Sequence, residues 1–162
     1  MTSQVLSKQL SPTAVQAFIR LLQGHAAATR ELSADLVRDH GLTINDYEAL
    51  LRLSRADDRR LKRVELAETL VLTPSGVTRL LDGLERAGYV EKGSCDSDAR
   101  ITYAVLTDTG LDKLRDASTS HVAQIRTFFE QRFDDDELAR LADLLGRLAE
   151  AAGDGEDCVP PE

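Results

Sequence analysis

The most constraining feature of this sequence is a helix start at Thr73-Pro74, close behind a shorter helical segment at residues 64–70. Threonine is a favoured N-cap and proline is favoured at the first helical position, so this helix has a sharply defined beginning. Gly88 ends it, because glycine tolerates the left-handed turn that follows many helices. One apolar stripe marks the buried face of the helix: Val77, Leu80, Leu81 and Leu84. Two helices joined by so short a turn must pack against each other at a fixed angle.

A strand-like hairpin follows this helix pair. Residues 89–92 and 101–106 have the composition of two strands, and the turn formers in residues 93–98 join them. An earlier helix is expected to begin at Thr43, and Leu61 is expected in a very short strand. The order helix, short helix, helix, strand, loop, strand predicts a winged helix-turn-helix domain over residues 43–106. Such a fold can push its second helix into a major groove about 12 Å wide.

Long amphipathic helices are expected on both sides of this unit. The first occupies residues 12–40, and two more fill residues 107–152. The stripe of the first helix runs at spacings of three and four residues: Val15, Phe18, Leu22, His25, Thr29, Leu32 and Leu36. These stripes are too long for a small winged core to cover, so pairing between two chains is expected to bury them. The alternative is a monomeric bundle. The fold class is therefore mainly α (α+β), with dimerisation helices around a winged domain.

The two ends of the chain and its overall composition give expectations for disorder, cellular location and metal binding. Residues 1–11 are expected to form a flexible arm and residues 153–162 a disordered acidic tail. The sequence contains no run of eighteen apolar residues, so no membrane span is expected. The N-terminus does not resemble a signal peptide, so a cytoplasmic location is expected. The three histidines are scattered and the two cysteines are far apart, which predicts neither a metal site nor a cofactor.

The formal net charge of −8 is unevenly distributed along the chain, and this distribution bears on whether the chain can contact phosphates. Residues 52–100 carry a net charge of +1, whereas residues 1–51 carry −1 and residues 101–162 carry −8. Half of the 20 lysines and arginines lie in that middle segment. A locally basic middle within an acidic frame is compatible with contact between that middle and phosphates. Charge alone is equally compatible with an ordinary mixed-charge surface.

Several short segments together carry a resemblance to a known family. They are residues 64–67, 72–82 and 84–90, the wing motif Asp98-Ala99-Arg100, and Leu106-Thr107 followed by Gly110. In these segments the chain resembles the MarR (multiple antibiotic resistance regulator) family of transcription factors, and the resemblance covers about residues 12–152. It implies a homodimeric, ligand-responsive repressor that reads a pseudo-palindromic double-stranded DNA operator. Recognition helix 73–88 and wing 93–100 would make the contacts, with the two recognition helices ~34 Å apart.

The resemblance also implies which residues contact DNA. On the recognition helix they are Ser75, Gly76, Thr78 and Arg79. Hydroxyl groups can bind base edges or phosphates, and arginine can bind guanine through two hydrogen bonds. Gly76 lowers helix propensity, and either close approach to DNA or local packing explains it.

In the wing, Arg100 would reach the minor groove or its phosphates, and Asp98 would orient it by a charge-assisted hydrogen bond. An ordinary hairpin ion pair is the alternative. Many family members carry a basic residue where Ala99 stands, and Glu91 adds a negative charge nearby. Both departures predict modest or strongly salt-dependent binding.

Family members commonly bind small phenolic or aromatic anions between the dimerisation helices and the winged domain. Here His25, Thr29, Tyr47 and Arg52 are candidates to supply a cation, donors and a ring to such an effector. Ordinary core or interface roles are the alternative for each of them. The peroxide-sensing branch of the family uses a cysteine in the first helix, and none stands there. Cys95 lies in the predicted wing and is expected to be inert.

An enzyme and a protein-binding adaptor are the alternatives to this interpretation. The sequence contains no Gly-rich phosphate loop, GxSxG or HExxH motif, so an enzyme is not expected. A winged helix can also bind proteins instead of DNA. Such an adaptor stays open, because the whole chain is acidic.

Overall fold

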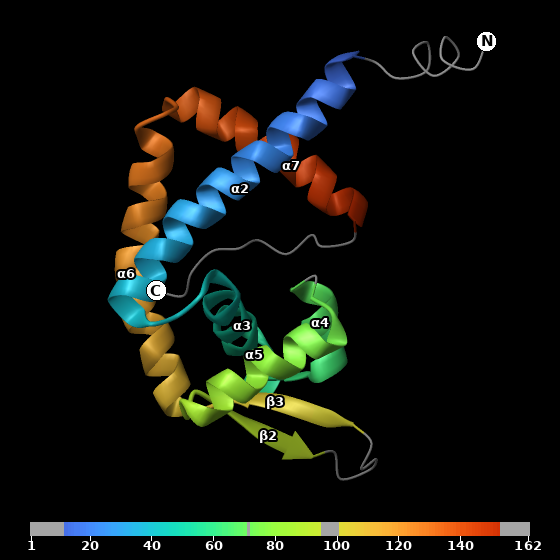
Figure 1. The fold of residues 1–162 in the computed structure, drawn as a ribbon, viewed down its shortest axis with the longest axis vertical. Coiled ribbons are helices and arrows are strands. Elements are labelled where there is room, and N and C mark those ends of the chain that lie inside the picture. The colour runs from blue at the N-terminus through green and yellow to red at the C-terminus, as the bar shows by residue number, and fades with distance from the viewer. Residues whose placement is uncertain (1–11, 71, 95–100, 153–162) are drawn as a thin grey trace, which may run out of the picture.

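The structure is a computed structural model that describes residues 12–70, 72–94 and 101–152. It is largely helical, with one small antiparallel sheet, and it confirms the predicted winged helix-turn-helix fold (Figure 1). In chain order the elements are α2 (Pro12–His40), α3 (Ile44–Arg55), the 3-10 turn η1 (Asp57–Arg59), β1 (Arg60–Lys62), α4 (Arg63–Thr69), α5 (Pro74–Arg86), β2 (Val90–Ser94), β3 (Thr102–Leu106), α6 (Asp108–Glu130) and α7 (Asp135–Ala152).

The sheet and three helices form the winged part of the molecule. The strand order is β1-β3-β2, and both pairings are antiparallel. Leu61 pairs with Ala104 across β1 and β3, and Val90 pairs with Leu106 across β2 and β3. Helices α3, α4 and α5 pack over this sheet around a common apolar core (Figure 1). The predicted short strand at Leu61 is therefore the third strand of the sheet.

The predicted helix starts are also present. At α3, the Asp46 amide donates to Thr43 Oγ1 over 3.2 Å, and the Thr43 amide donates to Asp46 Oδ2 over 2.9 Å. This reciprocal pair is a capping box, which satisfies two amides that the helix itself leaves unbonded. At α5, the Gly76 amide donates to Thr73 Oγ1 over 3.1 Å. Gly88 follows the last turn of α5 with φ at +76°, the left-handed conformation expected of it.

Between α3 and β1, the turn η1 contains Asp58 and Arg59, which both have φ at +53°. One local prediction was wrong in detail. Strand β2 extends to Ser94, although Gly93 and Ser94 were expected in the hairpin loop. Both residues pair with β3, opposite Tyr103 and Thr102. Ladder hydrogen bonds override the turn propensity of these small residues.

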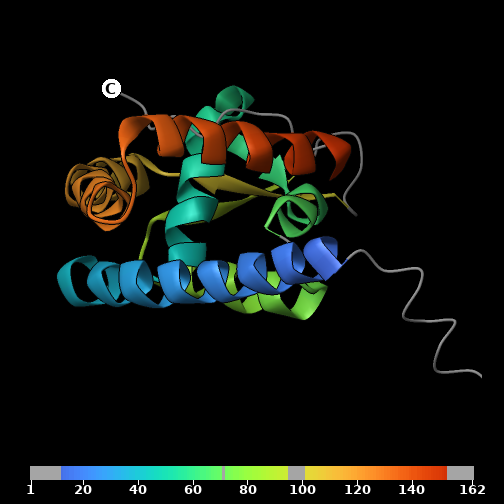
Figure 2. The ribbon, with the colours of Figure 1, turned by 90° about the horizontal axis from the view of Figure 1, so that it is seen from above.

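The long helices divide into a packed part and an uncovered part. The C-terminal end of α2 packs against α6, and Leu36, Leu114 and Ala117 are buried there. The N-terminal half of α2 is exposed, and no described side chain of α7 is buried. These two helices cross in Figure 1 but lie on opposite sides of the molecule in Figure 2, so neither covers the other. None of the described helices is long and apolar enough to cross a lipid bilayer.

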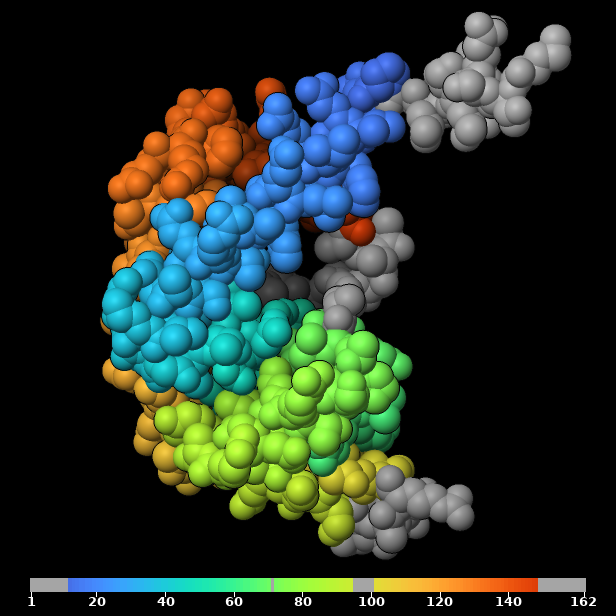
Figure 3. Space-filling model, in the orientation of Figure 1, coloured from blue at the N-terminus to red at the C-terminus, as the bar shows by residue number. Residues whose placement is uncertain are grey.

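Exposed apolar side chains mark these uncovered helices. On α2 the large ones are Val15, Phe18, Ile19, Leu21, Leu22 and Val37, and on α7 they are Leu144, Leu145 and Leu148. Phe18 is 60% exposed and Leu148 is 57% exposed in the single chain, and the sequence predicts that a second chain covers the stripes of both helices. In Figure 3 the N-terminal half of α2 stands clear of α4 and α5. One chain therefore leaves a large apolar surface unpaired.

The start of α6 lies against the end of α5, and the contact is close at Gly110. A Cβ atom on Gly110 would lie 2.1 Å from the Tyr89 carbonyl oxygen and 2.8 Å from Leu106 Cδ1. A backbone oxygen cannot move aside as the tip of a side chain can. Glycine at this position is therefore required by the approach of the two elements.

We expect Gly110→Ala to lower the free energy of unfolding by about 1–3 kcal/mol, the usual range for overpacking a tight contact. Gly83→Ala is the matched control, because Gly83 lies in helix α5 and, apart from its chain neighbours and the backbone of that helix, no atom lies within 4 Å of its ideal Cβ position. The control should be neutral or more stable by about 0.5–1 kcal/mol, since alanine favours helix. Urea unfolding of both variants measures the difference, and equal stability would contradict the proposed clash.

Candidate nucleic-acid interface

The outer face of α5 gathers the residues predicted to contact DNA. Val77, Leu81 and Leu84 on the inner face are buried and fix the orientation of the helix. Ser75, Thr78 and Arg79 are exposed on the outer side, and Gly76 is half-buried. The structure therefore brings these four predicted residues together on the first two turns of one helix. Amide groups at a helix N-terminus also favour an anion such as phosphate.

The exposed polar side chains on this face are held by the backbone of their own helix. Thr78 Oγ1 donates to the Pro74 carbonyl over 2.9 Å, and Arg79 Nε lies 3.5 Å from the Ser75 carbonyl. Two turns further along, Arg86 Nε donates to the Asp82 carbonyl over 3.1 Å. Among the described residues the outer guanidinium nitrogens of both arginines have no further partner, so these nitrogens are available to a ligand.

Arg86 was not among the residues predicted to contact DNA. It lies seven residues after Arg79, a spacing that places both on one helix face, and this spacing could have identified it. A shallow hollow runs between the two arginines along α5, lined also by Asp82 and Glu85. The two carboxylates reduce the positive charge of this surface, so its attraction to phosphate is weaker than the arginines alone would give.

Gly76 has a packing reason of its own. A Cβ atom there would lie 3.2 Å from Thr73 Oγ1 and 3.6 Å from Leu72 Cβ. The first distance is tight, and Thr73 Oγ1 is occupied as the cap of α5. The packing explanation for this glycine thus has support in the structure. Close approach to DNA stays a prediction.

The tip of the wing lies outside the described residues. The predicted contact residues Asp98 and Arg100 belong to it, and so does Cys95. At the base of the wing, Lys92 Nζ on β2 lies 3.1 Å from Glu85 Oε2 on α5. This ion pair connects the wing strand to the predicted recognition helix. Glu85 was not a predicted functional residue, because its partner becomes visible only in the folded chain.

Other basic residues of the middle segment are paired with carboxylates. Arg59 Nη1 lies 2.9 Å from Asp108 Oδ1, and Lys62 Nζ lies 2.9 Å from Glu65 Oε1. Lys62 holds the pKa of the Glu65 carboxyl below its usual range. The side chain of Arg60 lies over the ring of Tyr103, 5.0 Å from the ring centre. Much of the basic charge counted in the sequence is therefore committed within the fold.

The four residues predicted for an effector pocket fall into two pairs. His25 and Thr29 lie on α2, with His25 Nε2 3.5 Å from Thr29 Oγ1, and His25 is exposed. Tyr47 and Arg52 lie on α3, where Arg52 Nη2 is 3.4 Å from Glu48 Oε1. No hydrogen bond or ring contact between the two pairs occurs in the described part of the chain.

Tyr47 belongs instead to a polar junction between α2, α3 and α6. Its hydroxyl lies 3.1 Å from Ser118 Oγ, and its ring meets the ring of His121 edge-on, with centres 4.7 Å apart. His121 is only 3% exposed, and its Nδ1 has no hydrogen-bond partner among the described residues. Burial and the nearby His40 lower the pKa of His121, while Asp35 acts in the opposite direction.

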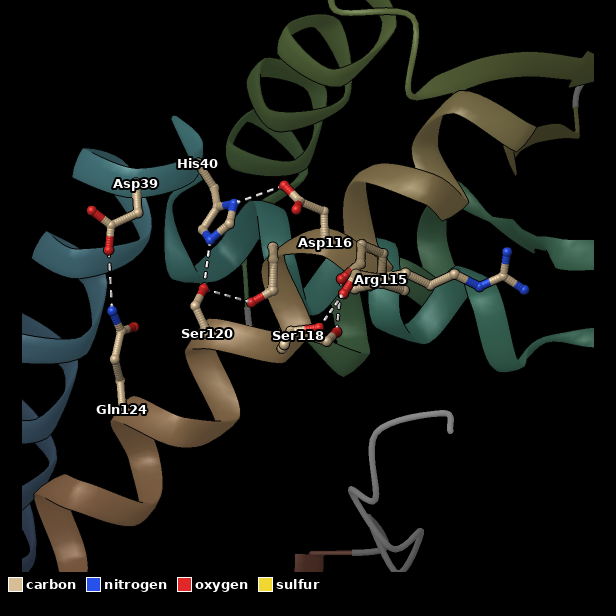
Figure 4. Close-up of polar contacts among 10 residues, drawn as sticks. Asp39, His40, Arg115, Asp116, Ser118, Ser120 and Gln124 are labelled. Atoms are coloured by element: carbon tan, nitrogen blue, oxygen red, sulfur yellow. Dashed lines mark hydrogen bonds and ion pairs between the residues drawn. The ribbon is translucent and has the colours of Figure 1, made fainter.

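His40, the last residue of α2, lies between Asp116 and Ser120 of α6 at this junction (Figure 4). Its Nδ1 lies 3.2 Å from Asp116 Oδ2, and its Nε2 lies 2.6 Å from Ser120 Oγ. One turn further along α6, Gln124 donates to Asp39 Oδ2 over 3.2 Å. These contacts join the C-terminal end of α2 to α6 by polar groups as well as by apolar packing.

A separate hollow of about 220 Å³ lies between α2 and α6. It is lined by Glu31, Leu32, Asp35, Ala123, Gln124, Thr127, Phe128 and Gln131. None of the four predicted effector residues lines it. In the described ranges, no group of three or more His, Cys, Asp or Glu side chains is placed to hold a metal ion.

Comparison with known proteins matches this chain to transcriptional regulators. The MarR family model matches residues 40–101. The transcriptional repressor YetL of Bacillus subtilis is 33% identical over 110 residues, which are 68% of this chain and 65% of YetL. This match thus spans just under two thirds of the relative. The regulator MhqR of the same organism is 23% identical over 69% of this chain and 75% of its own length.

Solved structures match over nearly the whole fold. AbsC, a MarR family regulator from Streptomyces coelicolor, is 32% identical with a TM-score of 0.76, covering 88% of this chain and 96% of AbsC. Sco3205 from the same organism, a MarR family regulator solved in complex with DNA, is 27% identical with a TM-score of 0.78. That match covers 93% of this chain and 94% of Sco3205.

The buried His121 predicts a loss of stability in mild acid. Its pKa is lower in the folded chain than the ordinary value of 6.5, so the unfolded chain binds the proton more readily. The free energy of unfolding is therefore highest above pH 6.5 and falls as the pH drops below it, with a slope of at most about 1.4 kcal/mol per pH unit from this group.

Urea unfolding between pH 7.5 and 5.5 measures this dependence. We expect His121→Gln to flatten the curve and His25→Gln, at an exposed position, to leave it unchanged. An equal slope in the wild type and the His121 variant would show that another group causes the loss.

Proposed function

The chain belongs to the MarR family of winged helix-turn-helix transcriptional regulators, and from this premise we propose that it is a homodimeric repressor of a pseudo-palindromic operator. One α5 from each chain would enter the major groove. The observation that carries the proposal is the division of α5 into a buried apolar face and an exposed face with Arg79 and Arg86. Family membership favours this function over a winged-helix adaptor that binds proteins.

The contact residues in the proposed complex follow from this orientation. Ser75, Gly76, Thr78 and Arg79 would line the major groove, with Arg86 toward the phosphates. Asp98 and Arg100 of the wing would act at the neighbouring minor groove, as the sequence resemblance implies. Residues 43–106 would form the DNA-binding domain.

The uncovered faces of α2 and α7 support the dimer. Their exposed leucines and phenylalanine lie on the N-terminal half of α2 and on α7, where the described residues of the same chain leave them uncovered. Burying such surfaces against a second copy removes them from water, at roughly 25 cal/mol per Å² of apolar area. Residues 12–40 and 107–152 would therefore form the dimerisation part, with a two-fold axis that matches the operator.

We also propose that a small aromatic anion releases the protein from DNA. Such an effector would act by favouring a dimer whose recognition helices have the wrong spacing. His25, Thr29, Tyr47 and Arg52 remain the proposed contacts, contributed by α2 and α3. The relatives named above support regulation of transcription, and the chemistry of the effector rests on the resemblance alone.

Selection of random and genomic DNA fragments on the purified protein tests the central proposal. The oligomeric mass is measured in the same buffer. We expect a pseudo-palindrome with half-sites one helical turn apart and a mass of two chains. Absence of any enriched sequence at low salt would overturn the proposal and favour the adaptor.

Arg79→Ala should weaken binding to the selected operator by about 1–3 kcal/mol, or roughly 5- to 150-fold, without unfolding the protein. Arg126→Ala is the matched control, because Arg126 is an exposed arginine on α6, paired with Glu130 and outside α5 and the wing. Fluorescence anisotropy with labelled operator measures both. If the two variants lose affinity equally, α5 does not read the operator.

Phe18→Glu and Leu148→Glu should each convert the dimer to monomers or weaken it strongly, because each places a charge within the proposed apolar interface. Val64→Glu is the control: Val64 is 68% exposed on α4, which packs against α5, β1 and β3. Sedimentation velocity measures the mass. A dimer that survives both interface variants would exclude these helices as the interface.

A further inference from the structure

We propose that Thr107 is a positioning residue for operator reading. Its hydroxyl donates to the Gly88 carbonyl over 2.7 Å and so fixes the end of α5 to the start of α6. In the proposed dimer this bond would set the half-site separation that the two recognition helices accept. The inference rests on the proposed function, and the test below separates a failure of one from a failure of the other.

The Thr107 hydroxyl takes part in two different bonds. As an acceptor, its oxygen receives the Gly110 amide over 3.0 Å, which is the ordinary N-cap of α6. As a donor, it binds Gly88, which lies 19 residues earlier in the chain and just beyond α5. The second bond is not needed to cap a helix. It connects two elements instead.

The surrounding backbone makes this connection stiff. The Thr107 amide donates to the Tyr89 carbonyl over 3.1 Å, and the Tyr89 amide donates to the Leu84 carbonyl in the last turn of α5 over 2.9 Å. The Gly110 backbone lies so close to the Tyr89 carbonyl that no Cβ would fit. A continuous path of hydrogen bonds and close contact therefore leads from the last turn of α5 into α6.

Gly88, Tyr89, Thr107 and Gly110 form a joint between α5 and α6. Helix α6 runs for 23 residues from this joint to the polar junction with α2 and on toward α7 (Figure 1). A change of angle where α5 meets α6 would move the recognition helix relative to the dimerisation helices. The ion pair between Glu85 and Lys92 would carry the wing with it. The separation of two half-sites is thus sensitive to this one joint.

Three substitutions of Thr107 and one control separate the role of the hydroxyl as N-cap acceptor from its role as donor to Gly88. Thr107→Ser keeps both acceptor and donor. Thr107→Asp keeps the N-cap but cannot donate to Gly88, and Thr107→Gly removes the hydroxyl while keeping a tolerated N-cap residue without added charge. Leu53→Ala, at a buried position of α3 outside the joint, lowers stability through a cavity and controls for general destabilisation.

Each full-length variant is used to select random DNA, and its affinity for the wild-type operator is measured below its unfolding temperature. We expect Thr107→Ser to stay within twofold of wild type. Thr107→Asp and Thr107→Gly should bind the wild-type operator at least tenfold more weakly and select half-sites at shifted or broadened separations. Leu53→Ala should keep the wild-type separation.

The inference is overturned if either donor-lacking variant is folded and keeps wild-type affinity and separation. It is equally overturned if Leu53→Ala shifts the separation as much as they do. If the wild type itself selects no DNA, the proposed function fails, and the role of Thr107 in operator reading fails with it. If Arg79→Ala weakens binding but Thr107→Gly changes nothing, only the inference about Thr107 fails.

Discussion

The orientation of α5 depends on one packing constraint, the burial of Val77, Leu81 and Leu84 against the core of the winged part. A helix with one apolar stripe can bury only one face, so the opposite face is turned to solvent. That opposite face carries Ser75, Thr78 and Arg79. The same three apolar side chains therefore stabilise the domain and determine which polar groups a ligand meets. The sheet, α3 and α4 supply the core against which this choice is made.

The fold also determines which basic side chains are neutralised by carboxylates and which are not. The middle segment is basic by count, yet Arg59 and Lys62 are engaged by carboxylates in the folded chain. Within the described part of the chain, Arg79 and Arg86 are bound only by backbone carbonyls of their own helix. An acidic protein can thus direct a few cations at a phosphate backbone, because binding depends on local potential and not on the net charge of the whole chain.

The parts that could be predicted from the sequence are those with local causes. The caps at Thr43 and Thr73 and the end of α5 at Gly88 each depend on residues within a few positions of one another. The bond from Thr107 to Gly88, the Glu85–Lys92 pair and the burial of His121 arise between distant segments, so local patterns carried no sign of them. The long stripes predicted a partner surface, and the exposed Phe18 and Leu148 are consistent with that expectation.

The bare apolar surfaces of α2 and α7 have a consequence for mixtures of chains. A chain that lacks Arg79 keeps both helices intact, so in the proposed dimer it would still pair with a wild-type chain. Each mixed dimer would have only one recognition helix with Arg79. It would therefore lose the increase in DNA affinity that comes from binding two half-sites at once. Such a substitution would act dominantly in a cell that makes both chains, whereas a substitution that disrupts α2 or α7 would be recessive.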